Sequence, residues 1–198
     1  MSKERDLIKF IFEQHNRLSC IVRFNNTPRL ASENVAEHSY YVAFLSMLIG
    51  DYLEEKGLEF DKLRLLRMAL VHDVEEIISG DIIKVLKSGE FKKELDNLNL
   101  KSMQSLTGVL GEKGKLYLDL WQETKDKKTL EAKIVDLVDT VALMVYCMKE
   151  VHLGNRFLRG TLAWGVEEIL KFSERIPEAG KIIDELGGYA LAYLQEDK

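Results

Sequence analysis

The stretch KLRLLRMALVHDVEEII, residues 62–78, indicates the fold more clearly than any other part of the chain. Its apolar residues recur at helical spacing, Asp61 before it is suited to cap a helix, and the run Ser79-Gly80-Asp81 after it is typical of a break. Near its end, His72 and Asp73 interrupt the apolar run. Because an unpaired charge inside a helical core is costly, this pair predicts a compensating partner.

The rest of the chain has the same helical period. Helices are expected at residues 4–18, 35–56, 91–110, 115–124, 130–152, 157–172 and 181–194. Asn34, with Glu37 three residues later, is similar to a capping box, whereas residues 23–34 have little periodicity and predict a loop. The chain has only two prolines, and no segment alternates as a strand would. The sequence therefore predicts an all-α, compact helical bundle, with residues 1–198 forming one domain.

Composition excludes several classes of protein. The 198 residues include 46% hydrophobic and 31% charged residues, a globular balance. The net charge of −5 (28 basic against 33 acidic residues), with no basic block, argues against binding to nucleic acid polymers or anionic membranes. The N-terminus is charged at once, and Cys20 and Cys147 form no CxxC pair. We therefore expect a cytoplasmic protein without a membrane span, with both cysteines as buried thiols.

Polar residues interrupt two further apolar helical runs. His38 lies in NVAEHSYYVA (34–43), and Asp136 and Asp139 lie in KIVDLVDTVALM (133–144). His72 and Asp73 should point about 100° apart on their helix, and both could reach an ion in a groove between helices. A divalent cation held by two imidazoles and two carboxylates would compensate all of these groups together. At this point either late aspartate is a candidate for the fourth ligand.

The segments around these histidines and aspartates resemble the sequence motifs of the HD-domain phosphohydrolase superfamily. The runs ENVAEHS (33–39), HDVEE (72–76) followed by Ser-Gly-Asp, and VDTVALMVYC (138–147) are similar to its 5′-deoxynucleotidase branch, and the similarity covers residues 17–155. The resemblance implies His38, His72, Asp73 and Asp139 as metal ligands, with Asp139 preferred over Asp136 because of its spacing to Cys147. The sequence has no histidine between His72 and His152, which favours a single ion. Histidine ligands favour Mn²⁺, Co²⁺, Fe²⁺ or Zn²⁺ over Mg²⁺.

The resemblance also implies roles for residues around the metal. Glu76, four residues after His72, would activate the attacking water, and Asp81 would lie near the sugar or the leaving group, although it could equally cap the next segment. Arg23 would orient the substrate phosphate, which its guanidinium fork matches. Phe24 would lie beside the substrate where the family has tryptophan. Glu75 and the lysine run 125–128 are expected to be solvated.

The implied activity is hydrolysis of deoxyribonucleoside 5′-monophosphates, small-molecule nucleotides, by a homodimeric enzyme. A triphosphohydrolase acting on (d)NTPs and a non-catalytic metal- or nucleotide-binding module are the alternatives. One departure concerns residues 82–85, Ile-Ile-Lys-Val, where the deoxynucleotidases carry Pro-Thr-Pro. The loop that would border the nucleoside therefore differs from that of the deoxynucleotidases, and the substrate preference is expected to differ with it.

Overall fold

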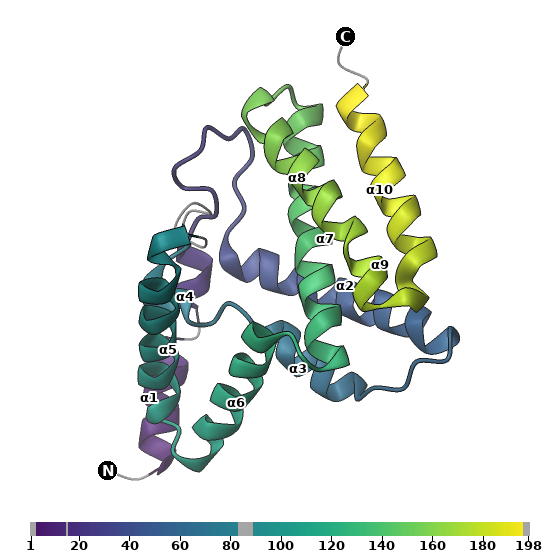
Figure 1. Cartoon of the computed structure of the whole chain (residues 1–198). Coiled ribbons are helices and arrows are strands. Elements are labelled where there is room, and N and C mark those ends of the chain that lie inside the picture. The colour runs from purple at the N-terminus through teal and green to yellow at the C-terminus, as the bar shows by residue number, and fades with distance from the viewer. Residues whose placement is uncertain (1–2, 15, 83–88, 196–198) are drawn as a thin grey trace.

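The computed structural model describes residues 3–14, 16–82 and 89–195 and is built from helices (Figure 1). The α-helices are α1 (Lys3–Glu13), α2 (Val35–Glu55), α3 (Lys62–Val71), α4 (Glu76–Ser79), α5 (Lys92–Gly108), α6 (Glu112–Asp126), α7 (Leu130–His152), α8 (Arg159–Leu170), α9 (Phe172–Arg175) and α10 (Gly180–Gln195). Short 3₁₀ helices are η1 (Arg17–Cys20), η3 (Gly89–Phe91), η4 (Arg156–Leu158) and η5 (Pro177–Ala179). Within the described ranges there is no strand, only an isolated antiparallel bridge between Val22 and Asn34. The all-α prediction is confirmed.

Helix α7 is the centre of the fold. It is apolar on nearly all sides, which is the pattern of a helix surrounded by other helices. It packs against α2, α3, α6, α8 and α10, and α2 runs across it in Figure 1. The main core cluster is formed largely by these helices, with Leu137, Val42, Met68 and Leu162 among its fully buried side chains. A polar group on the inner face of α7 is therefore held by several neighbours at once.

Two predicted helix starts are present in the structure. The Asn34 side chain accepts a hydrogen bond from the Glu37 amide at 2.9 Å, and the Glu37 carboxylate accepts one from the Asn34 amide at 2.9 Å. This reciprocal pair is the predicted capping box, and it fixes where α2 begins. Asp61 caps α3 by accepting from the Arg64 amide at 2.9 Å. Both caps lie on helices that carry candidate site residues.

Three predicted helices are shorter or more broken than expected. The helix expected at 4–18 ends at Glu13, and residues 17–20 form a 3₁₀ turn instead. The helix expected at 157–172 divides into η4, α8 and α9. The helix expected at 62–78 stops at Val71 and resumes as α4, with residues 72–75 in a turn between them. Apolar periodicity thus indicates that a helix is present more reliably than it indicates where the helix ends.

The structure also bears on two expectations about composition. Cys20 is exposed, so the expectation of two buried thiols is wrong for Cys20 and right for Cys147. In the ranges that the structure describes, every helix is too short or too polar to cross a bilayer. Residues 83–85 of the segment that departs from the deoxynucleotidase pattern lie outside the described residues, as does His15, and His152 is exposed.

Candidate active site

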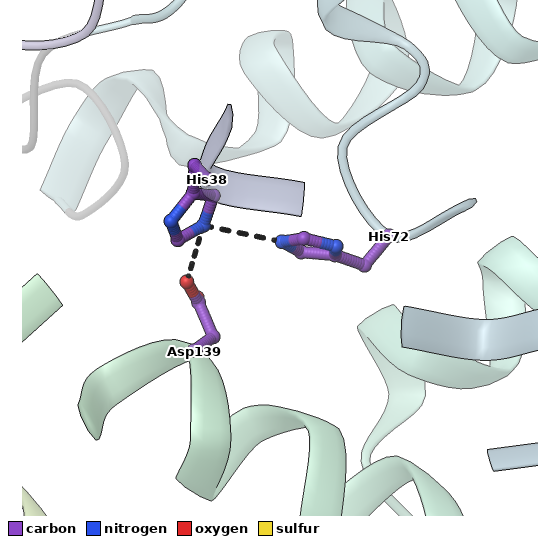
Figure 2. Close-up of side chains that lie close together, drawn as sticks. All are labelled: His38, His72 and Asp139. Atoms are coloured by element: carbon purple, nitrogen blue, oxygen red, sulfur yellow. Dashed lines mark hydrogen bonds and ion pairs between the residues drawn. The ribbon is translucent and has the colours of Figure 1, made fainter. Parts of the chain in front are cut away.

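The side chains of His38, His72 and Asp139 converge from three elements (Figure 2). His38 lies on α2, His72 caps the C-terminus of α3, and Asp139 lies on α7. The Nε2 atom of His38 is 2.9 Å from Oδ1 of Asp139 and 3.4 Å from Nε2 of His72. One potential ligand atom from each of the three residues lies within 4.8 Å of the others. Residues distant in sequence thus point their nitrogen and oxygen donors at one small region.

Asp73 joins this group through a turn at residues 72–75, which we call the HD turn. The amides of Val74, Glu76 and Ile77 each bond to the carbonyl three residues earlier, at 3.1–3.2 Å, as in a tightened 3₁₀ turn. His72 and Asp73 therefore lie on this turn and not on the continuous helix that the sequence predicted. The Oδ2 atom of Asp73 lies 3.1 Å from Nε2 of His72 and 3.7 Å from Nε2 of His38. The two consecutive side chains of this turn thus both reach the region of the cluster.

The two late aspartates have different surroundings. Asp139 faces the histidines, whereas Asp136 accepts hydrogen bonds from Lys127 at 2.6 Å and from Arg175 at 2.9 Å. Both carboxylate oxygens of Asp136 are thus engaged by cations away from the cluster. The arrangement favours Asp139 over Asp136 as the carboxylate from α7.

Protonation states in the cluster suit a cation. The Nδ1 atom of His72 lies 2.7 Å from the Ala69 carbonyl, which only accepts, so Nδ1 carries a proton and Nε2 is the ring nitrogen that faces the cluster. Burial, and next the Arg23 charge, lower the pKa of His38 to about 4. Burial opposes ionisation of Asp139, but the hydrogen bond and charge of His38 outweigh it and lower the pKa of the carboxyl. Two imidazole nitrogens and two ionised carboxylates fit a divalent transition-metal ion.

Arg23 connects the cluster to the loop before α2. Its guanidinium is 2.6 Å from Nδ1 of His38 and donates to Oε1 of Glu33 at 2.6 Å. A guanidinium cannot accept, so Nδ1 of His38 accepts in this arrangement. Arg23 and Glu33 are both buried. The sequence-predicted phosphate-binding residue therefore lies directly behind one of the candidate ligands.

Phe24 and Asp81 lie together beside Arg23. The backbone amide of Phe24 donates to Oδ2 of Asp81 at 2.9 Å, across 57 residues of sequence. Phe24 has a φ of 52°, a left-handed conformation that is uncommon for residues other than glycine and often marks functional loops. Its ring stacks on Tyr146 of α7 with centroids 4.9 Å apart. Asp81 thus holds the backbone of the loop that carries Arg23.

Glu76 and its neighbour Glu75 differ from the sequence expectation. Glu76 begins α4, so it does not share a continuous helix with His72, but it is buried and lines a cavity of about 620 Å³ together with Asp73. Glu75, expected to be solvated, is 2% exposed. It accepts a hydrogen bond from Nε1 of Trp121 at 2.6 Å and pairs with Lys125 at 2.7 Å. Lys125, expected at a solvated corner, does keep 39% of its side chain exposed, but it also pairs with Glu75 and lines the same cavity.

A buried carboxylate that sequence reasoning missed anchors the Arg23 loop. Glu150 of α7 is fully buried and accepts hydrogen bonds from the amides of Leu30 at 2.9 Å and Ala31 at 2.6 Å. Asn155 donates to the same carboxylate at 2.5 Å and to the Pro28 carbonyl at 2.8 Å. We call this group the Glu150 latch. In the sequence, Glu150 is only an acidic residue near the end of an apolar helix, and such a residue usually lies in solvent.

Comparison with known proteins gives consistent results. Residues 16–159 match the family model of the HD domain. A 5′-deoxynucleotidase of Dictyostelium discoideum is 36% identical over 116 residues, which cover 57% of this chain and 60% of that protein. A 5′-deoxynucleotidase of Vibrio vulnificus is 28% identical over 142 residues, which cover 70% of this chain and 73% of that protein. The match thus spans about three fifths of the length of the Dictyostelium protein.

A solved structure supports the same fold. The crystal structure of an HD-domain phosphohydrolase from Listeria innocua superposes with a TM-score of 0.83 at 24% identity, covering 96% of this chain and 92% of that one. The arrangement of helices around α7 is therefore an arrangement found in that protein.

Proposed function

This chain belongs to the HD-domain family, and on that premise we propose that it is a metal-dependent phosphohydrolase that converts deoxyribonucleoside 5′-monophosphates to deoxynucleosides and orthophosphate. The observation that carries the proposal is the position of Arg23, whose guanidinium lies 2.6 Å from a histidine of the candidate metal cluster. A cation-binding cluster and a phosphate-binding group at one point suit a phosphomonoester. The names of the relatives support the deoxynucleotide as substrate.

We assign His38, His72, Asp73 and Asp139 as the residues that hold one divalent ion. The ion, when bound, supplies polarisation of a phosphoryl oxygen and a lowered pKa for a water molecule. The mixed nitrogen and oxygen donors favour Mn²⁺, Co²⁺, Fe²⁺ or Zn²⁺ over Mg²⁺, which prefers an oxygen shell.

The chain's own groups then have separate tasks. Arg23 donates to the phosphate oxygens and offsets the charge that develops there. If Nε2 of His38 held the ion, Nδ1 would carry the ring proton and could no longer accept from Arg23, so the guanidinium would be available for the phosphate; the Glu33 carboxylate lies 3.9 Å from Nδ1. Glu76 takes the proton of the attacking water as the water oxygen bonds to phosphorus and the P–O5′ bond breaks, and O5′ takes up a proton from solvent to leave as the alcohol. Asp81 lies toward this alcohol, with Phe24 beside it.

Four further features belong to the same proposal. Residues 1–198 act as one domain, and the protein works in the cytoplasm. It forms a homodimer, and this is supported by large apolar side chains that α2 leaves 48–63% exposed: Tyr40, Tyr41, Phe44, Met47 and Leu48. Neither a nucleic acid polymer nor a membrane is a partner.

A phosphate-release screen tests the proposed activity. Purified protein is incubated with each dNMP, NMP and dNTP in the presence of Mn²⁺, Co²⁺, Zn²⁺ or Mg²⁺, and orthophosphate, pyrophosphate and tripolyphosphate are measured. We expect orthophosphate from dNMPs. Tripolyphosphate or pyrophosphate from dNTPs would identify a triphosphohydrolase, and bound metal without any phosphate release would identify a binding module.

A further inference from the structure

Lys125 lies against the HD turn, although nothing in the proposed reaction uses it. It is near the C-terminus of α6, and its Nζ atom donates to the His72 carbonyl at 2.6 Å. The same atom lies 2.7 Å from Oε1 of Glu75 and 3.6 Å from Oδ1 of Asp73. All three acceptors belong to the HD turn. One ammonium group, which has three donors, thus spans the whole turn.

Trp121, one helical turn earlier on α6, completes this contact. Its Nε1 atom donates to the second oxygen of Glu75 at 2.6 Å, and Lys125 lies over its ring at 5.4 Å. Burial alone would lower the pKa of Lys125, but Glu75 and Asp73 outweigh it and raise that pKa, so the cation is permanent. Two residues of α6 therefore hold the HD turn through directed hydrogen bonds.

The two oxygens of the Asp73 carboxylate face different partners. Oδ1 lies toward Lys125, while Oδ2 is 3.1 Å from Nε2 of His72 and 3.7 Å from Nε2 of His38. An exposed aspartate could rotate freely, but Asp73 is within ion-pair distance of Lys125 through the oxygen that does not approach the histidines. Such outer partners orient a metal ligand and are typically worth a factor of roughly ten to a hundred in metal affinity.

We propose that Lys125 is a positioning residue that fixes Asp73 so that only Oδ2 faces the metal cluster, and that it thereby sets the metal affinity of the site. This inference rests on the proposed metal ligands. It predicts that the end of α6, which contributes no ligand of its own, contributes to metal binding.

A charge-neutral double variant tests this proposal. Lys125→Met alone would remove a positive charge near the cation, which strengthens metal binding, and would leave Glu75 buried without its ion-pair partner. Combining Lys125→Met with Glu75→Gln keeps the net charge and leaves an acceptor for Trp121. The matched control is Lys128→Met with Asp126→Asn, an exposed ion pair at the same end of α6 with Nζ and Oδ2 3.4 Å apart.

Binding of Mn²⁺ alone is measured by competition with a fluorescent chelator, and the absorption spectrum of the Co²⁺-loaded protein reports the ligand geometry. We expect the double variant to bind Mn²⁺ roughly tenfold or more weakly and to change the Co²⁺ spectrum. The control should match the wild type, and Lys125→Arg, which keeps the cation, should recover most of the affinity. Thermal melting in EDTA verifies that each variant is folded.

The outcomes separate this inference from the proposed function. If the folded double variant has the Mn²⁺ affinity and Co²⁺ spectrum of the wild type, Lys125 does not position Asp73. If the wild type itself binds neither ion, the metal ligands and this inference are both wrong. If the wild type binds metal but releases no phosphate, the proposed hydrolysis fails while the positioning role is still decided by the affinity data.

Discussion

Replacing Glu150 with glutamine should loosen the Arg23 loop without touching the metal ligands. The carboxylate is fully buried and accepts three hydrogen bonds, from the amides of Leu30 and Ala31 and from Asn155. Burial would raise the pKa of Glu150, but these donors outweigh it and lower the pKa, so the group is ionised at neutral pH.

The loss of stability can be worked out from the donors that each carboxylate oxygen of Glu150 accepts. Oε2 accepts from Leu30 and Asn155, and Oε1 accepts from Ala31. A glutamine keeps only one acceptor oxygen, so at least one donor faces an NH₂ group, and the bonds that remain lose their charge assistance. With roughly 1.5–3 kcal/mol for a hydrogen bond to a charged group and about 1 kcal/mol for a neutral one, Glu150→Gln should lower the free energy of unfolding by about 3 kcal/mol.

Function should change in a specific way. Glu150 lies eleven residues after Asp139 on α7, which is about 16 Å along the helix, so the metal affinity should not change. Arg23 would be less well placed, and KM for a dNMP should increase by roughly tenfold, or about 1.4 kcal/mol. Urea unfolding, hydrogen exchange of the Leu30 and Ala31 amides, and steady-state kinetics measure these three effects.

Glu54→Gln is the control for this experiment. Glu54 is exposed and pairs with Lys62 at 2.5 Å, and such surface pairs contribute at most about 1 kcal/mol. If Glu150→Gln unfolds at the same urea concentration as the wild type with unchanged amide exchange, the latch is not holding the loop. If stability falls but KM does not change, the latch holds the loop without positioning Arg23.

Three other outcomes are expected. Asp139→Asn should abolish Mn²⁺ binding in a chelator competition assay while Asp136→Asn keeps it, and the reverse pattern would exchange their assignments. Arg23→Met should reduce dNMP turnover with metal content intact. It should also destabilise the protein by roughly 3–5 kcal/mol, because it leaves Glu33 buried and unpaired. Adding Glu33→Gln should restore stability in denaturation assays but should not restore turnover in kinetic assays. Mn²⁺ affinity should rise with pH from 5.5 and level off above neutrality. Burial opposes the charge on His72, but Asp73 and Asp139 outweigh it and raise the pKa of His72, so at low pH the metal must displace a proton from this imidazole; His38, with a pKa of about 4, is already neutral and adds no pH dependence over this range. An Mn²⁺ affinity that does not change between pH 5.5 and neutrality would contradict the assignment of His72 as a ligand.

The sequence predicted the helices more accurately than their ends. The period of apolar residues depends only on which side of the chain is buried, and the capping box at Asn34 is a purely local contact, so both are readable from one chain. The break after Val71 was not predicted, because His72–Glu75 keep an apolar spacing that suits a helix. His72 and Asp73 both lie in this break, so their position on a turn was not predicted, although their convergence on one region was.

Partners that approach from distant segments were not predictable either. Glu75 has the sequence of a solvated helix residue, and only the approach of Trp121 and Lys125 from α6 makes its burial stable. The lysine run at 125–128 likewise contains residues with different surroundings, since Lys125 lies at the HD turn and Lys128 is 80% exposed. Charge alone does not reveal which lysine contacts the HD turn.

The sequence by itself determined the helical class and the set of residues able to bind a cation, because periodicity and donor chemistry are properties of the side chains. It left Asp136 and Asp139 as equal candidates on chemistry alone. Only the tertiary structure decided which aspartate faces His38, which oxygen of Asp73 faces the histidines, and which carboxylate on α7 anchors the Arg23 loop. These choices depend on the packing of helices that are far apart in sequence, and a carboxylate buried among them is stable only where donors from other segments reach it.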